Sequence, residues 1–126
     1  MAIRSNSKAA TDKIKAYIWE CLVERSDESS RFNVLGATFE GLCKAYTEYL
    51  DEIFRNDYKL KSTADRVRYD LDGGGAWEVG TWERAKMVGF WLDETEDEID
   101  RYYERGKADD MWRNLIVREV MKAAGR

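Results

Sequence analysis

The sequence predicts an all-α protein that forms a single compact bundle of about five helices. Apolar residues recur at intervals of three and four along most of the chain, and no stretch alternates between apolar and polar residues as a strand does. The chain also has no proline that could interrupt a helix. Its 126 residues, 44% of them hydrophobic, suit one domain with a sizeable core. We expect a flexible N-terminal tail over residues 1–10 and a single helical domain over residues 11–126.

The first helix is predicted from about Thr11, a suitable N-cap residue, to about Arg25. Its apolar residues follow the i, i+3, i+4, i+7, i+8 spacing of one helix face: Ile14, Tyr17, Ile18, Cys21 and Leu22. Cys43 falls on the apolar side of the next predicted helix in the same way. We therefore expect both cysteines to be buried free thiols.

A second, longer helix is predicted over about residues 34–55, with Asn33 as its N-cap. Gly36 and Gly41 would each cost this helix about 1 kcal/mol relative to alanine, so a later start near Thr38 is the alternative. After a turn, residues 62–65 (Ser-Thr-Ala-Asp) have the form of a capping box. They predict a short third helix that ends near Leu71.

A glycine-rich turn is predicted at residues 72–80. Gly75 and Gly80 have the spacing of a phosphate-binding loop, but Thr81 stands where that loop needs lysine. A calcium loop beginning at Asp70 would lack a side-chain ligand at Gly74 and the bidentate glutamate at Thr81. The main interpretation is a tight turn anchored from beneath by Trp77 and Val79. The alternative is a binding loop that presents Trp77 to a partner.

A long fourth helix is predicted over residues 81–105, with Thr81 as its N-cap and Gly106 as the residue that ends it. Its apolar residues repeat at three and four through the whole range, close to a heptad. Its second half carries an acidic run at positions 93–100. The simplest interpretation of this run is a solvent-exposed helix face without a binding function. A last helix is predicted from about Asp109 to just before Gly125.

The chain contains no histidine, which removes the usual general base and the commonest transition-metal ligand. A Ser-His-Asp triad, a Cys-His pair and the Glu-x-x-His pattern of di-iron bundles are therefore impossible. We expect no enzymatic activity, no metal and no cofactor. The sequence has neither a long apolar run nor a signal peptide, so we expect a cytoplasmic protein that makes no contact with a membrane.

The net charge of −4 arises entirely within residues 64–126, which disfavours direct binding to nucleic acid. The first functional hypothesis is a small non-enzymatic protein that binds a protein partner with a basic surface. By analogy of size and charge alone, it would be a phage or mobile-element inhibitor that blocks a host nucleic-acid-handling or defence complex. The predicted contact residues are aromatic and acidic: Trp77, Glu78, Asp93, Glu94, Asp97, Glu98 and Asp100.

The alternative hypothesis is a small regulatory or nucleic-acid-associated helical module. It would contact phosphate through a local basic patch formed by Lys59, Lys61, Arg66 and Arg68. An enzyme that uses carboxylates or a metal is a third hypothesis, for which no arrangement of residues fills the required roles. The apolar helix faces are equally compatible with a monomer and with a homodimer.

Overall fold

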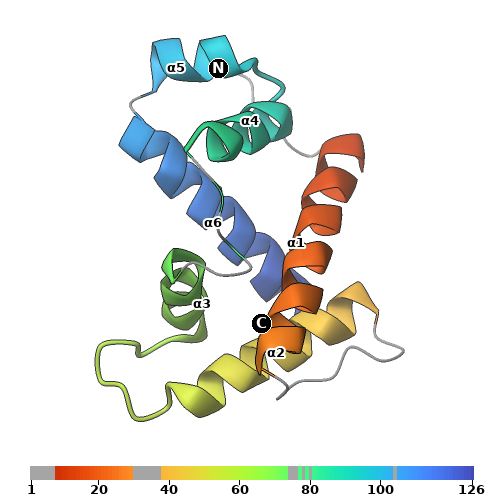
Figure 1. Cartoon of the computed structure of the whole chain (residues 1–126), viewed down its shortest axis with the longest axis vertical. Coiled ribbons are helices and arrows are strands. Elements are labelled where there is room, and N and C mark those ends of the chain that lie inside the picture. The colour runs from red at the N-terminus through yellow and green to blue at the C-terminus, as the bar shows by residue number, and fades with distance from the viewer. Residues whose placement is uncertain (1–7, 30–37, 74–76, 78, 80, 104) are drawn as a thin grey trace.

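The computed structural model describes residues 8–29, 38–73, 77, 79, 81–103 and 105–126 (Figure 1). Within these ranges there are helices and no strands, so the all-α prediction is confirmed. The described residues form six helices: α1 (Lys8–Ser29), α2 (Phe39–Ile53), α3 (Thr63–Asp72), α4 (Thr81–Leu92), α5 (Glu96–Tyr102) and α6 (Arg105–Ala123). None of the described helices is both long enough and apolar enough to cross a membrane.

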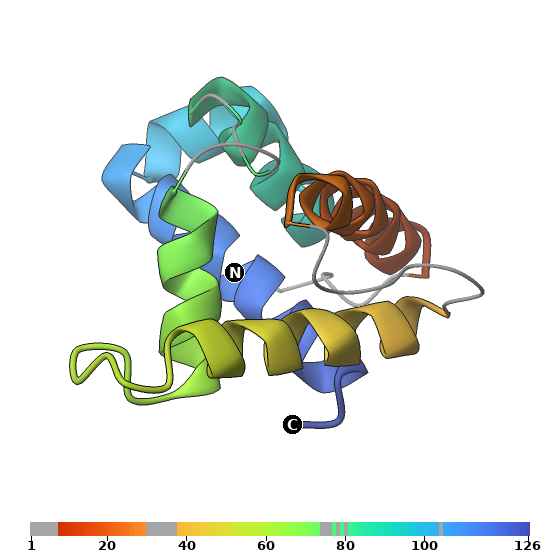
Figure 2. The ribbon, with the colours of Figure 1, turned by 60° about the horizontal axis from the view of Figure 1, so that its bottom comes forward.

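Helix α6 organises the fold, because it packs against α1, α2, α3 and α4. Figure 1 shows α4 and α5 at one end of the molecule and α2 at the other, with α6 running between them. Figure 2 shows α2 crossing the C-terminal part of α6, with α3 standing near one end of α2. The acidic run at positions 93–100 is thereby placed far from the α2 end.

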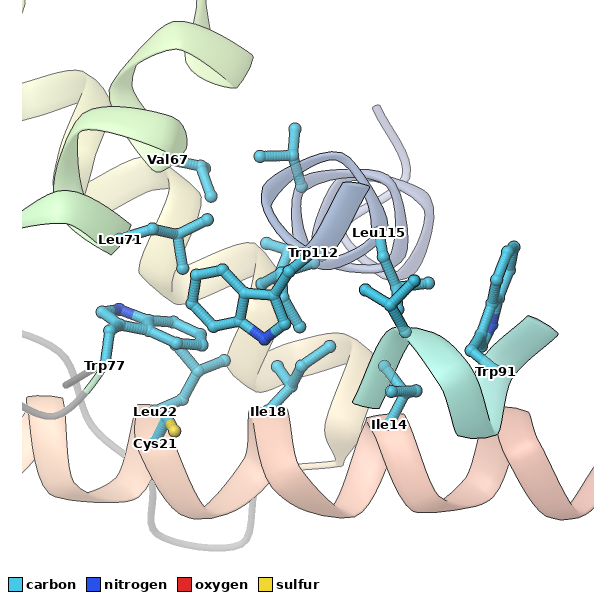
Figure 3. Packing of buried hydrophobic residues seen from close by; sticks show 14 of the residues in the cluster. Ile14, Ile18, Cys21, Leu22, Val67, Leu71, Trp77, Trp91, Trp112 and Leu115 are labelled. Carbon is cyan, nitrogen blue, oxygen red and sulfur yellow. The ribbon is translucent and has the colours of Figure 1, made fainter. Parts of the chain in front are cut away.

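The core forms where the apolar faces of all six described helices meet. Trp112 of α6 lies near its centre, facing Ile18 of α1 and Leu71 of α3 (Figure 3). Trp77 and Trp112 are both completely buried, and an aromatic side chain of this size removes roughly 150–250 Å² from water. Cys21 and Cys43 are buried and free, which confirms the prediction for both thiols.

The first three helices follow the local signals in the sequence, although α1 extends past both predicted ends to Ser29 and α2 starts late. Helix α1 begins at Lys8, so residues 8–10 belong to a helix and not to the predicted tail. Helix α2 takes the later of the two predicted starts, because Thr38 is its N-cap and accepts a hydrogen bond from the Gly41 N–H at 3.0 Å. Residues 34–37 lie outside the described residues. Ser62 caps α3 by accepting from the Asp65 N–H at 3.1 Å, which is one of the two bonds of the predicted capping box.

The prediction of one helix over residues 81–105 is wrong, because the chain turns after Leu92. Asp93 adopts a left-handed conformation with φ = 58°. The Asp93 N–H bonds to the Phe90 carbonyl at 3.3 Å and the Glu94 N–H to the Gly89 carbonyl at 2.7 Å, which is the Schellman pattern of a helix end. Thr95 and Glu98 then form a capping box that starts α5.

The prediction that Gly106 ends a helix is also wrong, since α6 begins at Arg105 and contains it. Tertiary packing outweighs the low helix propensity of this glycine, because α6 continues into the buried, central Trp112. Gly125 does end α6, with φ = 78°. The Arg126 N–H bonds to the Met121 carbonyl at 2.9 Å and completes this second Schellman motif.

An ion-pair cluster around Asp51 ties the C-terminus to α2 and α3. Its carboxylate lies 2.8 Å from Arg66 Nη1 and 2.7 Å from Arg126 Nη2, and the Thr63 hydroxyl donates to it at 2.8 Å. Burial acts to raise the pKa of Asp51, but the hydrogen bonds from Arg66 and Thr63 and the charge of Arg126 outweigh burial and lower it. Ionised Asp51 therefore stabilises the folded state.

We expect this contribution to be lost in acid. Because the folded-state pKa of Asp51 is lowered, its contribution is complete above the unfolded-state pKa of about 4 and disappears as the pH falls through the folded value. Urea unfolding of wild type and Asp51→Asn between about pH 7 and pH 2.5 measures it. The two curves of unfolding free energy against pH should converge below about pH 4. A constant difference down to the lowest pH would contradict the linkage.

Candidate functional site

Asp70, near the end of α3, is the centre of a buried polar network. Asp70 accepts hydrogen bonds from Arg25 Nη2 at 2.9 Å, from the Tyr46 hydroxyl at 2.5 Å and from Trp77 Nε1 at 3.0 Å. Burial, followed by the charge of Asp70, raises the pKa of Tyr46 well above its usual value. Tyr46 thus keeps its proton and remains a donor. The Asp70 carboxylate thus joins α1, α2 and α3 to Trp77.

Trp77 is therefore a structural anchor in this fold. Its indole is completely buried, its N–H is used by Asp70, and its ring packs against Tyr17 and Tyr46 with centroids 6.2 and 6.1 Å apart. The anchor interpretation agrees with the structure, and the prediction of Trp77 as a surface contact residue does not. Glu78, predicted as its neighbour in the site, lies outside the described residues.

The remaining predicted contact residues gather where α4 meets α5. We call Asp93, Glu94, Asp97, Glu98 and Asp100 the α4–α5 corner. Asp93, Asp97 and Asp100 are exposed, whereas Glu94 and Glu98 are half-buried. Glu98 has a structural task, because its carboxylate accepts from the Thr95 N–H at 3.1 Å in the capping box. The corner therefore presents three exposed aspartates on a turn and a short helix.

Two of these aspartates have no counter-ion among the described residues. Asp97 and Asp100 form no ion pair with any residue that the structure describes. Elsewhere, arginines neutralise aspartates: Arg25 pairs with Asp70, Arg66 and Arg126 with Asp51, Arg84 with Asp109, and Arg113 with Asp72 and Asp110. Negative charge is thus left unbalanced at the α5 end of the molecule.

Glu94 lies beneath this surface in an incompletely satisfied position. Its Oε2 atom is buried and has no hydrogen-bond partner within the described structure. Burial and then the nearby charge of Glu94 raise the pKa of Tyr103, which keeps that phenol protonated at neutral pH. The corner therefore combines exposed charge on Asp97 and Asp100 with one carboxylate already partly removed from water.

The conformation of Asp93 carries a cost that glycine would remove. A left-handed conformation costs an L-residue roughly 1–2 kcal/mol, and somewhat less for aspartate. We expect Asp93→Gly to raise the free energy of unfolding by up to about 1 kcal/mol and Asp93→Ala to lower it. Urea unfolding of both variants provides the measurement. Equal losses in the two variants would show that the backbone conformation is not the source of the cost.

The predicted basic patch is partly consumed by internal contacts. Arg66 pairs with Asp51 and donates to the Leu60 carbonyl at 3.0 Å, and Arg68 donates to Asn114 at 2.6 Å. Lys59 and Lys61 remain exposed on the loop between α2 and α3. Two of the four predicted cations are thus already engaged, which weakens the hypothesis of a phosphate-binding patch.

The described residues offer little for covalent or metal chemistry. Burial raises the pKa of Cys21 to about 11 and that of Cys43 to about 12, so both thiols stay protonated and inert at neutral pH. No group of three or more cysteine, aspartate or glutamate side chains in the described part of the chain is placed to hold a metal ion.

Sequence reasoning missed the two features that shape this region. The break before α5 had a local signal, since Thr95 and Glu98 form the T-x-x-E pattern of a capping box. The network around Asp70 had none, because Arg25, Tyr46 and Trp77 come from separate parts of the chain. Comparisons with protein-family models, with curated proteins and with solved structures find no match for this chain.

Proposed function

We propose that this chain is a small non-enzymatic binding protein whose α4–α5 corner contacts a protein partner with a basic surface. The observation that supports it is the exposed pair Asp97 and Asp100, which have no counter-ion in the described structure. Lysines or arginines of a partner would complete their electrostatic environment. Such complementarity speeds association and selects the partner more than it raises affinity.

Within this proposal, the partner is a nucleic-acid-handling protein whose basic surface is masked. Carboxylates held on a short helix can occupy the positions that phosphates would take on such a surface. An inhibitor of a host defence or nucleic-acid-handling complex, of the kind that a phage or mobile element encodes, would act in this way. The small size of the chain, its negative net charge and the unpaired carboxylates of the α4–α5 corner support this form of the proposal.

The test compares two variants that change the net charge equally at opposite ends of the molecule. The corner variant is Asp97→Asn with Asp100→Lys; asparagine is used in the first turn of α5 because a lysine there would oppose the helix dipole. The control is Glu48→Lys with Glu52→Gln, on the exposed face of α2. Each is immobilised, and the proteins captured from a lysate are identified by mass spectrometry.

We expect a partner that wild type and the α2 control retain equally and that the corner variant loses at least tenfold. The interaction should weaken as the salt concentration rises, because exposed charges are screened beyond about 10 Å at 0.1 M. Capture of the same proteins by both variants would exclude the corner as the binding site.

A further inference from the structure

A groove of about 250 Å³ lies between α4 and α6, next to the α4–α5 corner. Leu92, the last residue of α4, lines it and directly precedes Asp93. The groove walls are mainly apolar and come from the second half of α4 and the middle of α6: Val88, Trp91, Leu92, Met111, Leu115 and Arg118. Tryptophan, methionine and arginine are the residue types enriched at protein interfaces.

Trp91 gives the groove an unused hydrogen-bond donor. The side chain is only 8% exposed, and its Nε1 atom is buried with no hydrogen-bond partner among the described residues. Figure 3 shows Trp91 projecting from α4 beyond Leu115 of α6. Burial of a donor without an acceptor destabilises the free protein, and a docked carbonyl oxygen would relieve this penalty.

Arg118 covers this site loosely. Its guanidinium carbon lies 4.3 Å from the centre of the Trp91 ring, while 54% of its side chain remains exposed. Its distance of 3.8 Å from Glu119 is long for an ion pair. Arg118 can therefore swing away from Trp91 without breaking a strong contact, and its aliphatic stem can then border a bound segment.

The size of the groove favours side chains over a complete small ligand. Ligand pockets begin at about 300 Å³, above the volume found here. The α6 wall from Met111 to Arg118 rises about 10 Å, or two helical turns. That length matches apolar residues at positions i, i+3 or i+4, and i+7 of a docked helix. The acids beyond Leu92 favour lysine or arginine at the end of the segment that reaches the corner.

We propose that the α4–α6 groove receives the apolar face of a basic amphipathic helix of the partner. Its apolar side chains pack against Met111 and Leu115, one of its carbonyl groups accepts from Trp91 Nε1, and its cations face the α4–α5 corner. The inference rests on the proposed function, to which it adds the form of the partner and the anchor of the complex.

The test uses a synthetic peptide of about 14 residues in which leucines form one face of a helix and lysines the other. Its binding to the full chain is measured by isothermal titration calorimetry. We expect Met111→Glu to raise the Kd at least tenfold, because it places a charge on the groove wall. Met121→Glu is the matched control: both methionines are half-buried on α6, but Met121 lies outside the groove. It should leave the Kd within about twofold.

Two further measurements keep the proposal open to contradiction if Met111→Glu does not fold. Trp91→Phe keeps an aromatic ring and removes the N–H donor, and should raise the Kd about fivefold. A peptide with glutamates in place of the lysines should not bind wild type. Circular dichroism identifies any variant that has lost helix.

The outcomes separate the groove from the proposed function. Unchanged binding by Met111→Glu and Trp91→Phe, together with loss of binding by the corner variant, would overturn the groove proposal and leave the acidic site intact. Equal weakening by Met111→Glu and Met121→Glu would also overturn it. No binding of the peptide to wild type would overturn it as well, whereas the lysate comparison tests the corner independently.

Discussion

Replacing Asp70 by alanine is expected to lower the free energy of unfolding by about 3–5 kcal/mol, because it breaks a buried ion pair from one side. The Asp70 side chain is only 10% exposed, and Arg25 would keep its charge without a carboxylate. Tyr46 and Trp77 would lose the carboxylate to which their buried groups donate. Typical domains have a total stability of about 5–15 kcal/mol, so this change would unfold a domain at the low end of that range.

Urea unfolding followed by circular dichroism measures the effect, with Asp72→Ala as the control on the same helix. Asp72 pairs with Arg113 at the surface, so its loss should cost less than about 1 kcal/mol. Asp70→Asn, which keeps one oxygen acceptor but no charge, should fall between the two. If Asp70→Ala costs no more than Asp72→Ala, the network does not carry the stability assigned to it.

The parts of the fold that the sequence predicts are those with local causes. The spacing of Ile14, Ile18 and Leu22 is enough to place α1 and its buried face. The caps at Thr38 and Ser62 fix the starts of α2 and α3, because each bonds to an N–H only three residues away. Signals of this kind need no knowledge of tertiary structure.

The Asp70 network could not be predicted in this way. Arg25 and Asp70 are 45 residues apart, and they meet only because α1 and α3 both pack around the same core. The same limit explains Trp77. A tryptophan beside glycines is equally compatible with an exposed loop and with a buried anchor. Trp77 is buried because its N–H finds an acceptor in Asp70, which the sequence does not reveal.

The break between α4 and α5 was missed for a different reason, because two local patterns compete there. The repeat of three and four residues passes from Val88 through Leu92 and Thr95 to Ile99. Val88, Leu92 and Ile99 are all buried. The capping box at Thr95 and the left-handed Asp93 divide the helix without disturbing that apolar face. Periodicity therefore located the core correctly and the helix boundary wrongly. Because α4 ends at Leu92, the acidic residues lie on a corner and not along one continuous helix.

Gly89→Ala is expected to destabilise the protein by about 1–3 kcal/mol, the usual cost of overpacking a tight site. A Cβ atom at this position would lie 2.7 Å from the Glu94 carbonyl oxygen and 3.4 Å from the Ile99 side chain. The oxygen belongs to the backbone and cannot rotate away. The α4–α5 turn must then open, which weakens the 2.7 Å hydrogen bond from the Glu94 N–H to the Gly89 carbonyl.

Gly106→Ala is the matched control, since it makes the same substitution in a helix where a Cβ would meet no atom within 4 Å. It should stabilise the protein by up to about 1 kcal/mol through helix propensity. Opposite signs for the two variants in urea unfolding would show that contact across the turn requires glycine at position 89. A gain in stability for Gly89→Ala would mean that α4 continues past Leu92. The α4–α5 corner, and with it the placement of Asp97 and Asp100, would then have to be abandoned.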